Sequence, residues 1–232
     1  MRKSPFTAIE MILVIAIASV LLTIALPAFT RMAAGRQLTR AVSDIAAKIS
    51  LARAKAVSTR SYVALIFPQI KDGKFEGVSG SDLSQDHALV NCSYRLAQVY
   101  KDASGNFHFA KWMPDEDWEI FGEGVYIGGA AADFKVASGS QTLPEVQSVS
   151  YDSLYSGKSA DADRAVIFSP TGKIVLNGTG NSKIQIRVAE GVLLPPNFDD
   201  IQPKKETDGK TTYAVLSVSA LSGRAEVSYE EE

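Results

Sequence analysis

The sequence predicts an α+β protein in which a long N-terminal α-helix packs against an antiparallel β-sheet head. Three observations lead to this prediction. Residues 11–30 form an apolar run without a charged side chain, residues 36–60 repeat apolar residues at helical spacing, and residues 61–232 hold short strand-forming stretches between turn signals. With 232 residues, the chain is long enough for one ordinary domain and a segment with a separate task.

The apolar run at residues 11–30 has the length of about 20 residues that spans a bilayer as a helix. Arg2 and Lys3 precede the run and favour a cytoplasmic N-terminus. Three interpretations are open: a cleaved secretory signal, for which no good cleavage site follows, a plain membrane anchor, and a segment that packs against neighbouring copies. Glu10 bears on this choice, because a carboxylate at the membrane centre costs roughly 3 kcal/mol. Only packing against a neighbour offers it a positive partner.

A second pattern follows the apolar run. Apolar residues recur every three or four positions, as on one face of an α-helix, at Leu38, Val42, Ile45, Ile49, Ala52 and Ala56. Neither glycine nor proline interrupts residues 36–60. We therefore predict one helix from about Thr7 to about Thr59, with a kink favoured near Pro27. Its second part is expected to pack on the sheet through these six residues, which we call the helix stripe.

The rest of the sequence predicts β-structure. Strands are expected at residues 61–67, 88–99 and 107–112, in a hairpin at 165–176, at 183–188, and in a last pair at 211–218 and 224–229. Side chains alternate between the two faces of a strand, so Ile184, Ile186 and Val188 are expected to point inward. Three irregular stretches, residues 71–86, 130–163 and 190–209, are predicted surface loops and the best candidates for partner contacts.

Few side chains could carry chemistry. His87 and His108 lie at no metal-ligand spacing, and Cys92 is expected to be a small buried hydrophobic residue. The acidic residues 115–117 could contact calcium, but three consecutive acids cannot all face one ion, so a solvated turn is favoured. The net charge of −2 argues against a nucleic-acid partner. We predict no catalytic residues, no cofactor and no metal, and therefore no enzyme.

Residues 6–17, FTAIEMILVIAI, resemble the start of a type IV pilin or type II secretion pseudopilin. In that family a prepilin peptidase cuts just before a phenylalanine, the new terminus is N-methylated, and a glutamate four residues later pairs with the terminal amine of an adjacent subunit. The resemblance gives these roles to Phe6 and Glu10, and Pro27 matches a proline common in the family. Where the family has glycine before the cut, this chain has Pro5. Either the peptidase accepts this proline, or the protein stays uncut and anchored.

Two later stretches, residues 168–172 and 215–224, are similar to the C-terminal half of H-type minor pseudopilins. The resemblance therefore implies a pilin-like fold. It also implies a division of the chain into a leader peptide at residues 1–5, a transmembrane and assembly helix at 6–30, an amphipathic helix at 31–60 and a β-rich head at 61–232.

The resemblance further implies a minor pseudopilin-like structural subunit of a type II secretion or type IV pilus-like filament, in a tip or initiation complex. Such a subunit crosses the bacterial inner membrane once and carries its head in the periplasm. Its expected partners are other pilins or pseudopilins and the prepilin peptidase. The alternative is a membrane-anchored extracytoplasmic β-domain that binds a ligand or an envelope polymer without forming a filament. In that case the loops at residues 71–86 and 130–163 would carry the activity.

Overall fold

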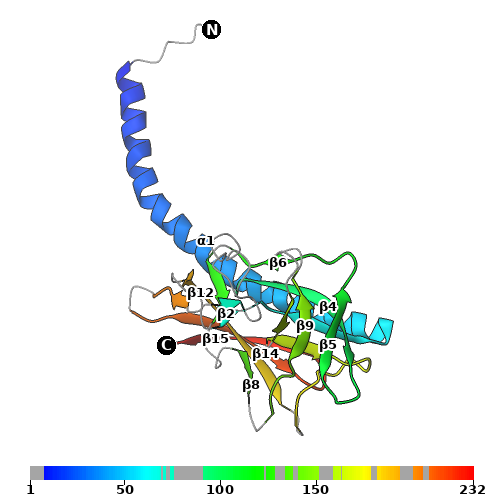
Figure 1. Cartoon of the computed structure of the whole chain (residues 1–232). Coiled ribbons are helices and arrows are strands. Elements are labelled where there is room, and N and C mark those ends of the chain that lie inside the picture. Colours follow the sequence, from blue (N-terminus) through cyan, green and yellow to red (C-terminus); the bar gives the residue numbers. More distant parts are fainter. Residues whose placement is uncertain are drawn as a thin grey trace. The chain divides into compact units, whose positions relative to one another are not determined.

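The protein is α+β, with a long N-terminal helix and a β-rich unit (Figure 1). The computed structural model describes residues 8–68, 70–71, 74–75, 91–122, 124–128, 134–137, 141–151, 159–162, 164–178, 182–193, 201–205 and 209–232. Helix α1 (Ala8–Thr59) has 52 residues and agrees with the predicted helix. The chain forms two compact units, Met1–Gln37 and Leu38–Glu232. Among the described residues, no helical segment combines the length and the apolar character needed to cross a membrane.

The strands belong to the Leu38–Glu232 unit. They are β1 (Tyr62–Ile66), β2 (Ile70–Lys71), β3 (Lys74–Phe75), β4 (Ser93–Lys101), β5 (Phe107–Trp112), β6 (Glu119–Ile120), β7 (Val125–Ile127), β8 (Phe134–Val136), β9 (Val146–Ser150), β10 (Ser159–Ala162), β11 (Ala165–Phe168), β12 (Lys183–Leu193), β13 (Ile201–Pro203), β14 (Thr212–Ser219) and β15 (Ala225–Glu231).

The first sheet has the strand order β10-β9-β5-β4-β1-β11, and β6 pairs with β4. Its two outer strands, β10 and β11, are separated by only two residues of the chain. Ala162 and Ala165 can therefore be at most roughly 11 Å apart, so the sheet must curl enough to bring these two strand ends near each other. The inside of this curl holds a core of its own, which includes Ile66, Val99 and Val149.

The second sheet has the order β13-β12-β14-β15, and β7 and β8 also pair with β12. Ile184, Ile186 and Val188 of β12 are fully buried, which confirms the predicted alternation. They belong to a second core that also contains the inner faces of β1 and β4 and the helix stripe. One face of each sheet and one face of α1 therefore share this second core, which we call the main core.

Three predictions about the sheet need correction. Strands β5 and β9 pair in parallel, so the first sheet is not wholly antiparallel; the long connection between them permits this crossover. The predicted loop at 130–163 contains β8, β9 and β10, and the predicted loop at 190–209 contains the end of β12 and all of β13. Strands as short as β8, β10 and β13 show only weak alternation of apolar and polar residues. In β12, Gly191 interrupts this alternation, but its amide still donates to the Gly124 carbonyl oxygen at 2.8 Å.

The hairpin predicted at residues 165–176 is present only in part. Strand β11 and its turn form as predicted, with the Ser169 amide donating to the Lys173 carbonyl at 2.8 Å. The second predicted strand is reduced to an isolated bridge between Phe168 and Ile174. Most of the predicted loop at 71–86 and the start of the strand predicted at 88–99 lie outside the described residues.

Candidate assembly surface

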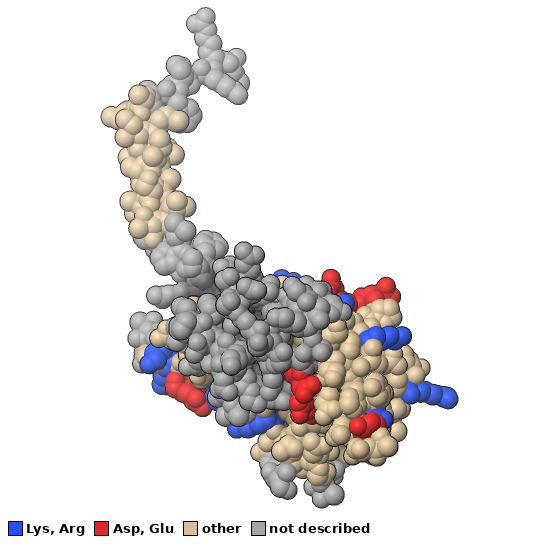
Figure 2. Space-filling model, in the orientation of Figure 1, with Lys and Arg blue, Asp and Glu red and all other residues tan. Residues whose placement is uncertain are grey.

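The most unusual surface of the protein is the N-terminal part of α1. Every residue from 8 to 23 is exposed, although this stretch contains ten large apolar side chains, from Ile9 at 75% to Ile17 at 53% exposure. On the face seen in Figure 2 this segment carries no charged side chain, whereas red and blue residues are common on the Leu38–Glu232 unit. A helix that is apolar all round is normally enclosed by lipid or by other protein. We call residues 8–23 the apolar segment.

Two hydroxyl groups of the apolar segment form hydrogen bonds within the helix. The Ser19 hydroxyl donates to the Ile15 carbonyl oxygen at 2.7 Å, and the Thr23 hydroxyl donates to the Ser19 carbonyl oxygen at 2.8 Å. Both hydroxyls are thus satisfied within the helix. Glu10 is the single charged residue of the segment and lies in the first turn of α1. A carboxylate is favoured there because the free amides of a helix N-terminus carry partial positive charge.

Other predicted assembly residues are less completely described. Pro5 and Phe6 lie outside the described residues, so the structure gives no distance between Phe6 and Glu10. Pro27 lies within α1, but its side chain is outside the described set. The structure therefore leaves the predicted roles of Phe6, Glu10 and Pro27 as predictions.

The helix stripe lies in the interior of the Leu38–Glu232 unit. Its six residues are at most 6% exposed, and four of them, Ile45, Ile49, Ala52 and Ala56, are completely buried. They share the main core with residues of both sheets, such as Leu65 and Leu216. The small side chains of Ala52 and Ala56 leave room for strands to approach the helix closely. The C-terminal part of α1 is thus fixed to the sheets by apolar packing.

A group of four charged residues also attaches α1 to the sheet region, and sequence reasoning missed it. We call Lys48, Lys55, Glu116 and Glu119 the charge cluster. The Lys48 Nζ lies 2.5 Å from Glu116 Oε2 and also contacts Glu119, and Lys55 Nζ lies 3.3 Å from Glu116 Oε1. The side chains of Lys48 and Glu116 are only 9% and 11% exposed. The acidic stretch at 115–117 was predicted to be solvated, and for Glu116 this is wrong.

The environment of the charge cluster changes its ionisation. Burial alone would lower the pKa of Lys48, but the hydrogen bonds to Glu116 and Glu119 outweigh it and the pKa is raised. Burial would likewise raise the pKa of Glu116, and the bonds to Lys48 and Lys55 reverse this, so its pKa is lowered. Both shifts favour the charged pair. One sequence signal pointed to this site: Lys48 comes directly before Ile49 of the helix stripe, at the border of the buried face.

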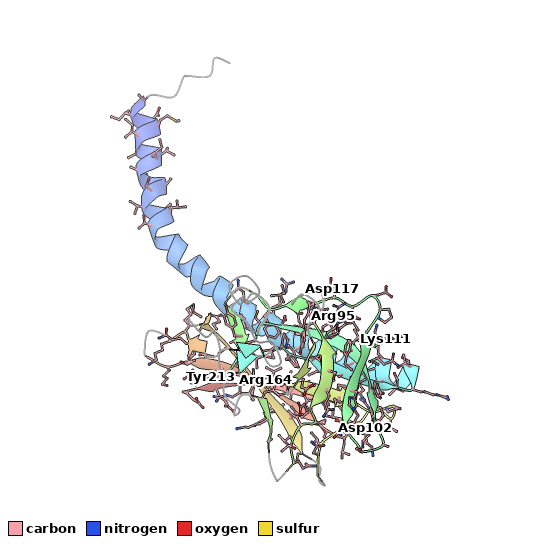
Figure 3. The ribbon with its side chains drawn as sticks, in the orientation of Figure 1. Arg95, Asp102, Lys111, Asp117, Arg164 and Tyr213 are labelled. Atoms are coloured by element: carbon pink, nitrogen blue, oxygen red, sulfur yellow. The ribbon has the colours of Figure 1, made fainter. Side chains whose placement is uncertain are left out.

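The segment that carries Glu116 is also held by Arg95 and by contacts between aromatic residues. Arg95 lies over the Trp112 ring at 4.9 Å, and its Nε donates to the Glu116 carbonyl oxygen at 3.1 Å. Figure 3 shows Arg95 close to Asp117, whose carboxylate is 3.7 Å from the guanidinium. The Trp112 and Trp118 rings meet edge to face at 5.1 Å. Glu116 and its neighbours are therefore attached both to α1 and to β4.

The turns in residues 168–172 and 215–224 lie next to each other on α1. Gly172 and Gly223 both have positive φ, at 77° and 63°. A Cβ atom at Gly172 would lie 3.0 Å from Val57 Cγ2, and one at Gly223 would lie 2.9 Å from Arg53 Cδ. Glycine is thus required in both turns by backbone conformation and by contact with the helix. Arg53, which sequence reasoning did not single out, is the residue that both turns contact.

The remaining candidate residues have structural surroundings. Cys92 is buried as predicted, and burial raises the pKa of its thiol to about 12, which disfavours the reactive thiolate. His108 Nε2 lies 3.1 Å from Asp102 Oδ2 in the turn between β4 and β5, and this contact contributes most to lowering the pKa of Asp102. His87 lies outside the described residues. Within the described part of the chain, no three potential metal ligands come together.

Comparison with known proteins gives one structural similarity. No protein-family model matches the sequence, and no curated protein matches it significantly. The chain is similar to the crystal structure of the type IV minor pilin FimU of Pseudomonas aeruginosa. The similarity covers 84% of this chain and 90% of FimU, with 15% sequence identity and a TM-score of 0.34.

Proposed function

We propose that this protein is a minor pilin-like structural subunit of a type II secretion or type IV pilus-like filament. In this proposal residues 6–30 anchor the chain in the bacterial inner membrane and later pack against the same segments of other pilins or pseudopilins. The β-rich unit lies in the periplasm and joins a tip or initiation complex. Phe6 becomes the methylated terminus after cleavage by a prepilin peptidase, and Glu10 pairs with the terminal amine of a neighbouring subunit.

The observation that carries the proposal is the exposure of the apolar segment on all sides. Removing ten large apolar side chains from water is worth on the order of 10 kcal/mol or more. Lipid or a bundle of identical helices would supply this burial. The internally bonded hydroxyls of Ser19 and Thr23 suit either environment, because neither needs a water partner.

Glu10 distinguishes assembly from simple anchoring. A carboxylate at the start of an apolar helix gains most from a positive partner that enters the same low-dielectric surroundings. The expected partner is the amine of a neighbouring Phe6, which exists only after removal of residues 1–5. Pro5 therefore decides whether this pairing is available.

The first test is the intact mass and N-terminal sequence of the protein extracted from membranes of its native host. We expect a chain that begins at methylated Phe6. A Pro5→Gly variant serves as the reference for a readily cut leader. If only the variant is cut, the native protein is a permanent membrane anchor and the filament proposal is wrong.

The second test measures co-assembly with partner pilins by crosslinking in membranes. Glu10→Ala is expected to abolish crosslinks between subunits and to leave the β-rich unit folded. Ser19→Ala is the matched control, because it also changes one polar residue of the apolar segment but removes only a bond within the helix. Unimpaired crosslinking of Glu10→Ala would show that Glu10 has no role in assembly.

A further inference from the structure

Strand β15 forms an open edge of the second sheet. In the described part of the chain it is paired with β14 alone, through seven consecutive residue pairs without a bulge. The strand contains no proline, and from Glu226 onward every residue is exposed. Natural sheets usually protect such edges by bulges, proline or a covering segment. Within the described residues β15 has no bulge, no proline and no second paired strand, and its acidic side chains are the one protective feature it carries. The Tyr229 hydroxyl also lies 3.3 Å from Thr39 Oγ1 of α1.

The pairing with β14 shows which backbone groups face the free edge. Thr211 and Glu232 exchange both backbone hydrogen bonds, and the Ser219 amide donates to the Arg224 carbonyl oxygen. In an antiparallel pair, bonded and non-bonded positions alternate, so Glu226, Ser228 and Glu230 also bond to β14. The amides and carbonyls of Ala225, Val227, Tyr229 and Glu231 therefore point away from the sheet, ready for another strand.

The side chains along this edge alternate in character. Val227 and Tyr229 pair with the core residues Leu216 and Ala214 and lie on the same face, yet they are 44% and 54% exposed. On the opposite face lie Glu226 and Glu230. An added strand would thus meet Val227 and Tyr229 on one face, with Glu231 at its end, and the carboxylates of Glu226 and Glu230 on the other.

The charges on β15 select the kind of strand that fits. Its charged side chains are all acidic, and antiparallel pairing of two copies about Ser228 would place Glu226 of one opposite Glu230 of the other. Like charges directly opposite each other are destabilising. Both glutamates already have cationic partners on β12, beyond β14: Lys183 lies 3.0 Å from Glu226 and Arg187 lies 3.7 Å from Glu230. The Lys183–Glu226 pair is about half exposed and is therefore a weak competitor, whereas the Arg187 side chain is only 14% exposed, so Glu226 is the more available of the two carboxylates.

We propose that the free edge of β15 binds an extended segment of a partner protein in which lysine or arginine alternates with apolar residues. The segment adds to the sheet as a further strand, its apolar side chains beside Val227 and Tyr229 and its cations beside Glu226 and Glu230. Backbone bonds give affinity in this mode of binding, and alternate side chains give specificity. The surface belongs to the Leu38–Glu232 unit, so the inference does not depend on the proposed role of the apolar segment.

The test uses the isotope-labelled full chain in an uncharged detergent and a short capped peptide that alternates lysine and valine. Amide hydrogen exchange is followed residue by residue by NMR. We expect slower exchange at Ala225, Val227, Tyr229 and Glu231. When the peptide occupies about nine tenths of the molecules, exchange should slow about tenfold, because only the free tenth exchanges. A peptide with glutamate in place of lysine should give no such protection.

Variants of β15 separate strand addition from general charge attraction. Val227→Pro removes an amide that faces only the free edge and should weaken peptide binding at least tenfold, whereas the control Val227→Thr keeps the amide and should bind normally. If Val227→Pro does not fold, the double variant Glu226→Lys/Glu230→Lys replaces it and should prefer the glutamate peptide. Absence of protection, equal protection by both peptides, or peptide preference unchanged by charge reversal would overturn the proposal.

Discussion

The two ends of helix α1 have the same backbone structure and opposite environments. In the apolar segment Ile12 is 67% exposed, whereas Ile49 of the helix stripe is fully buried. The difference lies in the sequence pattern, because the first part is apolar on every side and the second part only on one. Apolar character alone therefore does not show that a residue belongs to the core of its own chain. Whether the apolar residues form one stripe or surround the helix decides this.

The largest difference in unfolding free energy is expected between two matched side-chain truncations, one in each part of α1. Ile49→Ala should lower the free energy of unfolding by about 4 kcal/mol, because it removes buried methylene groups and leaves a cavity. Ile12→Ala should leave this free energy unchanged within about 0.5 kcal/mol. Urea unfolding in an uncharged detergent, followed by tryptophan fluorescence, measures both. A similar loss in the two variants would show that the apolar segment contributes to the core.

The charge cluster allows a second test of how firmly the C-terminal part of α1 is attached. Lys48→Met should cost about 3 kcal/mol of unfolding free energy, because it leaves the buried Glu116 without its closest cation. The double variant Lys48→Met/Glu116→Leu should recover most of this loss, since no unpaired charge remains. Urea unfolding of both variants and of Glu116→Leu alone completes the cycle. Additive losses would show that the two residues are not coupled.

A smaller loss of unfolding free energy is expected at the turn between β14 and β15, where Gly223 lies next to Arg53. Gly223→Ala should cost about 2 kcal/mol, from strain at positive φ and from crowding against Arg53. Gly209→Ala is the control, because Gly209 also has positive φ, at 84°, but no atom of the described residues lies within 4 Å of the added Cβ. It should cost about 1 kcal/mol, from strain alone. Thermal unfolding compares the two, and equal losses would show that crowding at Arg53 is unimportant.

The smallest expected effect is on the pH dependence of the unfolding free energy. Because the pKa of Glu116 is lowered from 4.5, its contribution to stability is complete above this value and is lost as the pH falls through the lower pKa of the folded state. Because the pKa of Lys48 is raised from 10.5, its contribution is complete below this value and is lost as the pH rises through the higher folded value. Glu116→Gln should therefore show a weaker loss of stability on acidification than the native chain. An unchanged acid profile in this variant would contradict the pairing.

The sequence predicted the main elements where a repeat extends over many residues. The helix and the inward residues of β12 follow from such repeats, and the structure agrees with both. Strands β8 and β13, with three residues each, are too short for alternation to be visible. Their presence depends on pairing with β12, which is a property of the folded chain and not of their local sequence.

The charge cluster escaped prediction for a similar reason. Glu116 and Lys48 are far apart in the chain and meet only because the sheet brings the segment after β5 against α1. Local charge patterns do not contain this information, and an acidic stretch next to two tryptophans is usually solvated. Residues 8–23 are different, because their apolar character on every side of the helix is already visible in the sequence.

The order of strands in the main core has a consequence for the synthesis of the protein. The helix stripe is made early, but its core partners on β14 follow by roughly 170 residues. At 5 to 20 residues per second, the ribosome needs roughly 10 to 30 s to supply them. Until β11 is made the stripe has neither of its sheets complete, and from then until β14 and β15 are made it still lacks the second sheet. Throughout this interval it presents apolar surface to whatever surrounds the nascent chain. The C-terminal strands thus set the earliest moment at which the β-rich unit can close.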